Sequence, residues 1–533
     1  MTAQNLLAAA RPTLGLVAVL LLVALYLYWQ GFAVFWAGFA SILFFYVLVF
    51  FVGAYASTRY QSASVSETFV AGRTVPLVIS VFTMSATWID GGYVNGTAEY
   101  TASAGLAWVQ APWGYALSLI IGGLFFARIM RRYEFKTMLD PLEQRFGKYM
   151  AGLLFLPALC GETFWTAAIL TALGTTFATI LNLDFNTAIV LSALIGIAYT
   201  SIGGLWAVAL TDVVQLLFLF FGLYLIIPFV LPHVGGLDNL IQNYTLKKGE
   251  MAWFFPPIDG WRHAAWGNQF WNWCDMALLL LFGGIPWQVY FQRVLSARDE
   301  DTAVRLSVLS GFVCLLAAIP PIIIGMVAAT VDWSTVGVEA PSSALSLPYV
   351  IRYLTNPVVA VIGLGAVAAA VMSSVDASIL SASSMLSWNI YRPLVRPDAS
   401  AQKLRAVLKK TIWIVGIAAM LMALQVKSVY VLWVLCSDLV YCILFPQLTT
   451  ALFDRKANVC GAAAGFLVSL FLRIGGGEMA LGLPCFLPYP MIENGLVLFP
   501  FRTFSMFCGL ITIMVVSRLT QKKYPPNGLR IVN

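Results

Sequence analysis

The sequence predicts an all-α membrane protein with about 14 transmembrane helices, of which ten form a core of two inverted halves. Three observations predict this class. Only 10% of the 533 residues are charged and 60% are hydrophobic, whereas an average soluble protein is about 25% charged. The hydrophobic residues fall in runs of about 20, the length that crosses a bilayer. Two of these runs are broken by glycine and proline at matching positions.

The same composition excludes several function classes. So few charges cannot cover a water-facing surface on a chain of this length, which excludes a soluble or disordered protein. The net charge of +7 does not indicate nucleic-acid binding, because the basic residues form no patch interleaved with aromatic residues. The eight cysteines show no CxxC pairs, so we expect buried thiols rather than disulfides or a zinc site.

Fourteen helical spans can be marked along the chain. We expect two N-terminal helices and a cytoplasmic loop in residues 1–75, a ten-helix inverted-repeat core in 76–456, and two C-terminal helices with a short cytoplasmic tail in 457–533. The run at 350–388 is longer than one membrane thickness, so it must tilt, bend or protrude. The spans lie near 14–30, 32–56, 76–103, 106–129, 149–181, 186–203, 206–232, 270–292, 303–331, 350–388, 411–425, 429–453, 458–475 and 502–517.

The basic residues predict the orientation of these spans. With the N-terminus in the cytoplasm, seven of the 31 lysines and arginines fall on outer segments, and the remaining 24 fall inside. Cytoplasmic loops of membrane proteins carry this excess of positive charge. We therefore expect a multi-pass protein of the cell membrane with both termini cytoplasmic. The long outer loop at 233–269 contains Trp253, Trp261 and Trp266 and is either an external lid or, the favoured alternative, an interfacial aromatic belt.

The third and eighth spans are broken near their centres. The third carries Asp90 and Gly91 within TMSATWIDGGYVNGTAEY, and the eighth carries Gly283 and Pro286 within GGIPWQVYFQR. A bilayer tolerates such breaks only where the freed backbone faces protein or a water-filled site. Four spans separate the two breaks, so each opens a five-helix half, and an odd number inverts the second half. This layout is typical of secondary transporters, and two chance kinks in an ordinary bundle are the alternative.

Several polar side chains are expected at membrane depth. An acid there is expensive and is a candidate functional residue, unless an interhelix hydrogen bond satisfies it. The segment AAAVMSSVDASILSASS places Ser373, Ser374 and Asp376 within two helical turns. Their oxygens suit a hard cation such as Na⁺, although serine cross-links between tightly packed helices explain the pattern equally well. The acids at this depth are Asp90, Glu162, Asp212, Asp275, Asp376 and Asp438.

Long stretches of the chain resemble the sodium:solute symporter family, specifically its high-affinity choline transporter branch. They cover about residues 70–520 and include TMSATWIDGGYVNGTAEY, MLDPLEQRFGKYMAGLLFLPALCGETFWTAAI, GGIPWQVYFQRVLS and GLGAVAAAVMSSVDASILSASSM. The resemblance implies a LeuT-like inverted repeat and Na⁺-driven import of choline, also coupled to chloride, without enzymatic chemistry. It assigns no position to the chloride ion.

The resemblance also implies a substrate site. Choline is a quaternary ammonium without N–H groups, so it is held by an aromatic cage in which each ring contributes about 0.5–2 kcal/mol. The family positions for this cage correspond to Trp88, Tyr115, Trp165 and Trp287. Asp90 stands where the branch has glycine, so an extra carboxylate beside the cage attracts the cation, alters ion coupling or indicates a different cationic substrate.

For Na⁺, the resemblance implies two serine hydroxyls and three backbone carbonyls as ligands. Asp212 matches a family acid linked to a second cation site, and Asp376 adds to the local negative field. The hydroxyls belong to Ser373 and Ser374, and the carbonyls to Ser85, Trp88 and Ala370.

Three alternative functions remain open at this point. The first is a Na⁺ symporter for another solute, such as a betaine, an amino acid or a sugar. The second is a membrane enzyme that acts on choline lipids, although no nucleophile–base pair or metal cluster supports it. The third is a sensor, which needs a signalling domain that the sequence does not contain.

Overall fold

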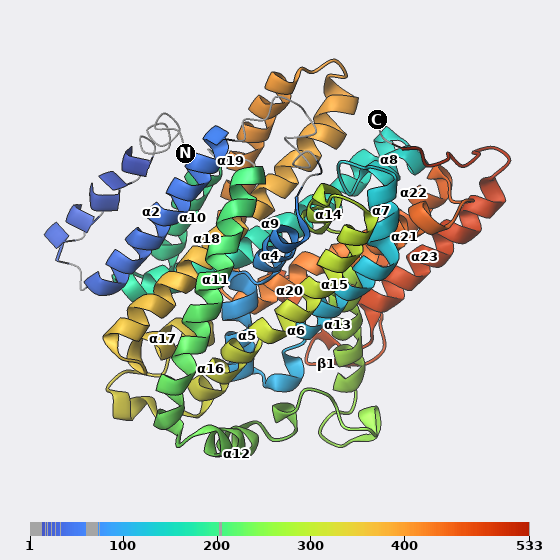
Figure 1. Cartoon of the computed structure of the whole chain (residues 1–533). Helices are drawn as coiled ribbons and strands as arrows, with labels where there is room; N and C mark the ends of the chain where they lie inside the picture. The colour runs from blue at the N-terminus through green and yellow to red at the C-terminus, as the bar shows by residue number, and fades with distance from the viewer. Residues whose placement is uncertain are drawn as a thin grey trace.

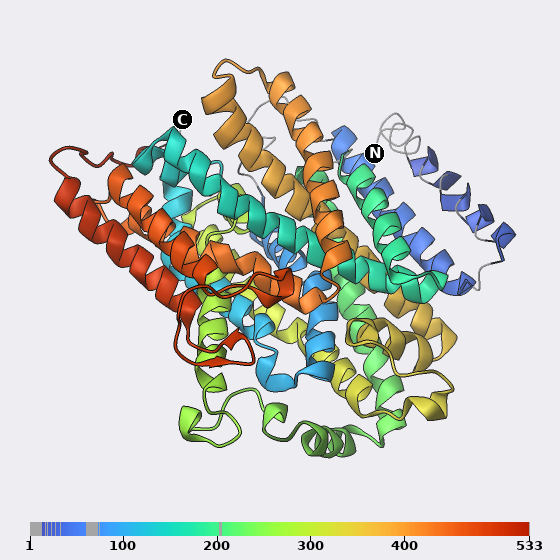
Figure 2. The ribbon, with the colours of Figure 1, turned by 180° about the vertical axis from the view of Figure 1, so that it is seen from behind.

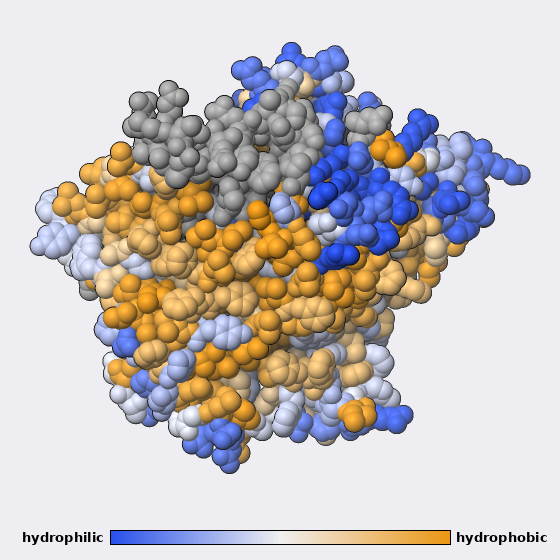
Figure 3. Space-filling view, in the orientation of Figure 1, coloured by the Kyte–Doolittle hydropathy of each residue, from blue (hydrophilic) through white to orange (hydrophobic). Residues whose placement is uncertain are grey.

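The computed structural model describes residues 13–31 except 16, 19, 23 and 27, and then residues 34–59, 73, 75–201 and 205–531. Within these ranges the side chains of Ser373 and Asp376, among others, lie outside the described part. The helices form one bundle, with α12 and α8 at opposite ends (Figures 1 and 2). A band of hydrophobic side chains crosses the face seen in Figure 3, between two more hydrophilic ends. This belt is the surface that a bilayer requires.

The first half of the core contains the first broken span and the helices that follow it. A π-helical turn, Gly122–Ala127, joins α6 to α7. The peripheral helix α2 (Trp36–Arg59) precedes this half, and a shorter apolar helix at Thr13–Tyr26 precedes α2. The helices of the half are α4 (Leu77–Trp88), α5 (Gly91–Ser103), α6 (Ala111–Ile121), α7 (Arg128–Arg132), α8 (Asp140–Phe146), α9 (Lys148–Leu181), α10 (Phe185–Thr200) and α11 (Leu205–Val230).

The second half opens with the second broken span. Its eighth and tenth core helices contain π-helical stretches at Leu386–Val395 and Val440–Leu444. Its helices are α13 (Gln269–Gly283), α14 (Gln288–Ser296), α15 (Glu300–Ala317), α16 (Ile319–Thr330), α17 (Ser346–Tyr353), α18 (Pro357–Met385), α19 (Ala401–Gln425), α20 (Val429–Leu439) and α21 (Phe445–Phe453).

The remaining elements lie at the periphery. The C-terminal helices α22 (Val459–Gly475) and α23 (Phe501–Thr520) lie side by side at one edge of the bundle in both ribbon views. Between them, β1 (Ile492–Glu493) and β2 (Leu496–Val497) pair antiparallel. Asn494 and Gly495 connect the strands with positive φ angles of 51° and 79°, the conformation that favours Asn-Gly in a tight hairpin.

The long loop between the two halves contains a helix of its own, α12 (Leu237–Lys248). Trp253 and Trp261 are exposed, whereas Trp266 is buried and stacks on Trp108 with ring centroids 5.9 Å apart. The predicted tryptophan-rich loop therefore divides. Two of its rings face outward, as an interfacial belt requires, and the third packs onto the bundle.

The described residues contain nine helices long and apolar enough to cross a membrane, or ten when the bent pair α4–α5 counts as one span. Shorter apolar helices lie at Thr13–Tyr26, Trp36–Phe45, Phe185–Ile197 and Val459–Gly475. The chain is therefore a multi-pass membrane protein, and the count of fourteen spans stays a prediction.

Two of the expected spans differ in detail from the structure. The run at 350–388 is divided, because Pro357 cannot continue α17 and Asn356 instead caps α18 by accepting from the amide N–H of Val359 at 3.0 Å. Its continuous helical path then extends to Val395. The span expected at 411–425 begins ten residues earlier, where Ser400 caps α19.

Candidate substrate and sodium site

The first helix break places an acid at a helix start. α4 ends at Trp88, and α5 begins at Gly91 with its axis bent by 47°. Asp90 caps α5 by accepting from the backbone N–H of Tyr93 at 2.6 Å, and its carboxylate also complements the positive end of the helix dipole. A Cβ atom on Gly91 would lie 2.8 Å from side-chain carbons of both Ala172 and Val371. The break is thus held tightly between α9 and α18.

The second break aims an indole ring toward the first. Gly284 to Trp287 leave the helical path, and Trp287 has extended dihedral angles (φ −111°, ψ 134°) as the residue that precedes α14. A Cβ atom on Gly283 would meet the backbone carbonyl oxygen of Ser437 at 2.8 Å. Glycine therefore lets α13 approach the backbone of α20 closely. Both predicted interruptions are confirmed.

The four aromatic residues expected to form the cage lie next to one another in the structure. Ring centroids are 5.1 Å apart for Tyr115 and Trp88, 6.0 Å for Trp88 and Trp287, and 5.2 Å for Trp287 and Trp165. None of these side chains exposes more than 5% of its surface. They come from α4, α6, α9 and the second break, so the break geometry and the helix packing assemble one aromatic cluster.

A fifth ring, Trp433 on α20, joins this cluster and was missed in the sequence. Its centroid lies 5.1 Å from that of Tyr115, whose hydroxyl pairs with Ser437 one helical turn further along α20. Trp433 lies three residues after Tyr430 and four before Ser437, so the three share one helix face. That spacing was the available indication, but a tryptophan in an apolar span is more often a core residue.

The indole nitrogens of the cage differ in their partners. Trp165 donates from Nε1 to the carboxylate of Asp90. Among the described residues, the Nε1 atoms of Trp88 and Trp287 are buried and have no hydrogen-bond partner. A buried donor without a partner is costly, so these two groups are available to a ligand. Both carboxylate oxygens of Asp90, in contrast, accept hydrogen bonds from the protein.

The candidate sodium ligands lie on two helices in contact, α4 and α18. The Ser85 hydroxyl is buried without a hydrogen-bond partner in the described part of the chain, beside the break. The carbonyl of Ala370 accepts from the buried Ser374 hydroxyl at 3.4 Å, a long bond that a cation ligand can give up. The donor set consists of neutral oxygens, which suits Na⁺. The side chains of Ser373 and Asp376 lie outside the described residues.

Asp212 on α11 has a strong partner that the sequence did not reveal. Its carboxylate accepts from the Thr83 hydroxyl of α4, and it lies 3.6 Å from Nη2 of Arg293 on α14. Both charged side chains are almost completely buried, with 0% and 2% of their surface exposed. The pair thus links α11 to the two broken helices, and Asp212 faces a protein cation already.

Two further buried acids, Glu162 and Glu99, make hydrogen bonds between helices rather than to the cage residues. Glu162 on α9 accepts from the Ser381 hydroxyl of α18. Glu99 on α5 accepts from the Ser428 hydroxyl at 2.6 Å and from the amide N–H groups of Val429 and Tyr430. Glu99 therefore satisfies the free N–H groups at the start of α20, a role that sequence reasoning missed.

Asp438 and Asp275 belong to a separate ion network that joins α13 and α20 to the C-terminal helices. Arg473 binds Asp438 with two nitrogens, and Arg502 donates to Asp438 at 2.9 Å. Arg502 also lies 3.7 Å from Asp275, and Glu478 pairs with both arginines. This network, defined by Asp275, Asp438, Arg473, Glu478 and Arg502, fixes α22 and α23 to α13 and α20. It explains these two acids without cargo binding.

The comparisons place this site in a known family. The model of the sodium:solute symporter family matches residues 68–469. The chain belongs to the sodium:solute symporter family. It is 45% identical over 506 residues to high-affinity choline transporter 1 of Drosophila melanogaster, covering 92% of this chain and 80% of that protein. The human high affinity choline transporter 1 is also 45% identical, over 502 residues, covering 91% and 85% of the two chains.

Solved structures of Na⁺-coupled and related symporters share the fold of this family member. A Na⁺-coupled sialic acid symporter in a substrate-bound outward-open state gives a TM-score of 0.75 at 20% identity, covering 93% of this chain and 99% of that one. Mhp1, a nucleobase-cation-symport-1 family transporter, gives 0.51 at 13% identity, covering 86% and 95%. The predicted LeuT-like fold is confirmed. The family and these relatives are transporters rather than enzymes.

Proposed function

We propose that the chain is a Na⁺-coupled symporter that imports choline across the cell membrane by alternating access. The observation that carries this proposal is the cluster of Trp88, Tyr115, Trp165 and Trp287 at the two helix breaks. The relatives named for high-affinity choline transport support the same cargo. At about 0.5–2 kcal/mol for each ring, several ring faces around a trimethylammonium group give appreciable affinity without any hydrogen bond to nitrogen.

The polar atoms of the cage suit the other end of choline. The free Nε1 groups of Trp88 and Trp287 are available to donate a hydrogen bond to its hydroxyl oxygen. Asp90 acts on the cation through its negative charge rather than by direct contact, because both its oxygens accept hydrogen bonds from the protein. Its bond to Trp165 also orients one wall of the cage.

Sodium is the second cargo. Its proposed ligands are the carbonyls of Ser85, Trp88 and Ala370 together with the hydroxyls of Ser373 and Ser374. A cation held between α4 and α18 stabilises the conformation in which these helices are correctly spaced, and this differential binding couples Na⁺ to choline. Asp212 and Asp376 add negative charge nearby, and Arg293 offsets that of Asp212.

Three further properties belong to this proposal. The N- and C-terminal segments lie in the cytoplasm, because 24 of the 31 basic residues then fall on the inner side. Transport proceeds inward, along the Na⁺ gradient of a cell. Chloride supports transport, as the resemblance implies, and its replacement by gluconate lowers uptake.

Uptake of radiolabelled choline into proteoliposomes tests the proposal. We expect accumulation that requires an inward Na⁺ gradient and stops when an ionophore dissipates it. Uptake that is equal with and without the gradient contradicts Na⁺ coupling. Competition with betaine, amino acids and sugars tests the cargo, because only quaternary ammonium compounds should displace choline.

A further inference from the structure

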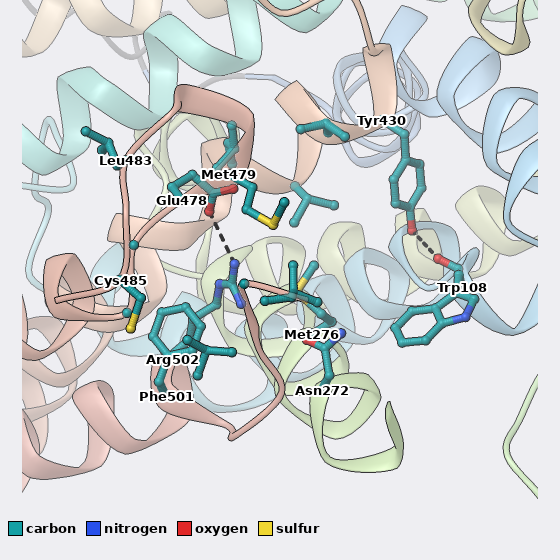
Figure 4. A pocket seen from close by; sticks show the side chains of 18 of the residues that line it. Trp108, Asn272, Met276, Tyr430, Glu478, Met479, Leu483, Cys485, Phe501 and Arg502 are labelled. Atoms are coloured by element: carbon teal, nitrogen blue, oxygen red, sulfur yellow. Dashed lines mark hydrogen bonds and ion pairs between the residues drawn. The ribbon is translucent and has the colours of Figure 1, made fainter. Parts of the chain in front are cut away.

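A cavity separate from the cage residues lies at the end of the bundle that carries α12, which is the outer end in the proposed orientation. It has a volume of about 300 Å³ and lies between α5, α13, α20, α23 and the segment that contains Glu478. We call it the outer cavity. Its walls present the rings of Tyr100, Trp108, Tyr430 and Phe501, together with Glu478 and Arg502 (Figure 4). Small-molecule sites combine apolar walls and a few polar groups in this way.

The charges of the outer cavity favour a cation. Glu478 lies 2.9 Å from Arg473 and 3.3 Å from Arg502. The same two arginines also face Asp438 and Asp275. Of these groups only Glu478 and Arg502 line the outer cavity, and their charges balance. With every group ionised, the whole network of three carboxylates and two guanidinium groups carries one net negative charge, and its field reaches the partly enclosed cavity from behind this wall.

The aromatic rings run from the outer cavity to the cage. Tyr100 and Tyr430 stack with centroids 3.8 Å apart. Tyr430 lies 5.9 Å from Trp433, and Trp433 lies 5.1 Å from Tyr115 of the cage. The ring faces along this path can attract an organic cation at each step.

Tyr430 separates the two sites. Its hydroxyl donates to the carbonyl of Trp108 at 2.8 Å, as the dashed line in Figure 4 marks, and accepts from the backbone N–H groups of Gln110 and Ala111. These bonds hold the tyrosine between α20 and the connection from α5 to α6. The outer cavity therefore lies on one side of a fixed ring, with Trp433 and the cage beyond it.

We propose that the outer cavity is a second binding site for small quaternary ammonium compounds, weaker than the cage, where the cargo waits before it passes Tyr430. This inference rests on the proposed function and adds a second site that choline occupies before it reaches the cage. The ring faces and the single net negative charge give weaker attraction than four convergent rings. The outer site therefore fills at higher choline concentration.

Asn272 offers a test that replaces no member of the ion network. It lines the outer cavity, and within the described part of the chain its side chain makes one long hydrogen bond, 3.4 Å, to Gln269. Asn272→Asp adds a negative charge without a change of shape, and Asn272→Lys adds a positive one. Asn243→Asp, on the exposed face of α12, is the matched control because it adds the same charge at the same end of the bundle.

The experiment is equilibrium binding of radiolabelled choline to the purified full-length chain. We expect two phases, of which Trp88→Ala removes the tight one. Asn272→Asp should strengthen the weak phase about threefold and Asn272→Lys should weaken it about threefold, as one charge at several ångströms does in a partly hydrated site. Asn243→Asp should change neither phase.

The outcomes separate the two proposals. A single tight phase that the Asn272 variants leave unchanged overturns the outer site and leaves the choline transporter intact. The outer site is also overturned when Asn243→Asp shifts the weak phase as much as Asn272→Asp does, because the effect is then surface charge alone. No choline binding at any concentration by a correctly folded chain overturns the proposed function itself.

Discussion

The indole rings of Trp88 and Trp287 lie with centroids 6.0 Å apart, although each belongs to a different interrupted helix. The two halves of the core thus contribute one ring each to the same small space. Any relative movement of the two halves changes the distance between these rings. The cage is therefore sensitive to the conformational change that alternating access requires.

Replacement of either ring should weaken choline binding. We expect Trp88→Ala and Trp287→Ala each to raise the dissociation constant at least tenfold, equal to about 1.4 kcal/mol, because each removes a ring face and a free indole N–H. Equilibrium binding of radiolabelled choline measures the effect. Trp253→Ala is the control, because that side chain is 59% exposed in the outer loop. Unchanged affinity in both cage variants contradicts the cage.

Asp90 should strengthen choline binding through its negative charge and through its hydrogen bond with Trp165. Asp90→Asn keeps the shape of the helix cap but removes the negative charge, so we expect the KM for choline uptake to rise about threefold to tenfold at unchanged protein level. Asp184→Asn is the control, because Asp184 accepts a similar hydrogen bond from a backbone amide, that of Thr187, in an exposed position. If the KM of Asp90→Asn equals that of the original chain, the carboxylate acts only as the cap of α5.

Ser374 should affect sodium rather than choline. Ser374→Ala removes a proposed ligand, and we expect the Na⁺ concentration for half-maximal uptake to rise about tenfold while choline still binds at saturating Na⁺. A series of uptake measurements over Na⁺ concentration tests this. Ser387→Ala is the matched control, since Ser387 also donates to the carbonyl four residues earlier in the same helical path. Equal effects of the two variants count against a specific sodium ligand.

The Asp212–Arg293 pair should act as a unit. Arg293→Met leaves the buried acid uncompensated, so we expect uptake to fall more than tenfold, whereas the Asp212→Asn, Arg293→Met double variant should recover part of it. Uptake normalised to surface protein is the measurement, with Arg298→Met at an exposed position as control. If the loss of uptake in the double variant equals the combined losses of the two single variants, the two residues act independently.

The outer ion network should matter for stability. Arg473 is 7% exposed and binds Asp438 with two nitrogens, so Arg473→Ala should lower the free energy of unfolding by about 3–5 kcal/mol. Arg518 is exposed and pairs with the partly buried Asp454, so we expect Arg518→Ala to lower the free energy of unfolding by less than about 1 kcal/mol. The unfolding midpoint of the purified chain in detergent compares the two. Similar midpoints argue that the network contributes no net stability.

Sequence reasoning found the parts of the site whose cause is local. Clustered glycines and prolines weaken a helix through their own backbones, so both breaks could be placed, although the lone prolines Pro157 and Pro228 remain inside α9 and α11. The charge distribution predicts an orientation, which stays a prediction. The positions of Trp88 and Trp287 followed from those breaks and from the family motifs.

The missed residues depend on partners distant in the chain. Nothing in the local sequence distinguishes Trp433 from a core tryptophan, because its role comes from Tyr115 on another helix. Glu99 accepts hydrogen bonds from the backbone N–H groups of Val429 and Tyr430. The role of Arg293 depends on its ion pair with Asp212. The predicted starts of α18 and α19 were inaccurate for a related reason. Each start is fixed by a single capping residue, Asn356 or Ser400, within an apolar or mixed stretch of sequence.

Arg502 also has a mechanical consequence. It stands at the first turn of α23 and reaches Asp275 on α13 and Asp438 on α20. The ion pairs of Arg502 therefore connect α13, α20 and α23 to one another. If the second broken helix moves, we expect these ion pairs to transmit the movement to α20 and to its cage residue Trp433. A spectroscopic probe on α23, far from the cargo, should consequently report when the cage opens and closes.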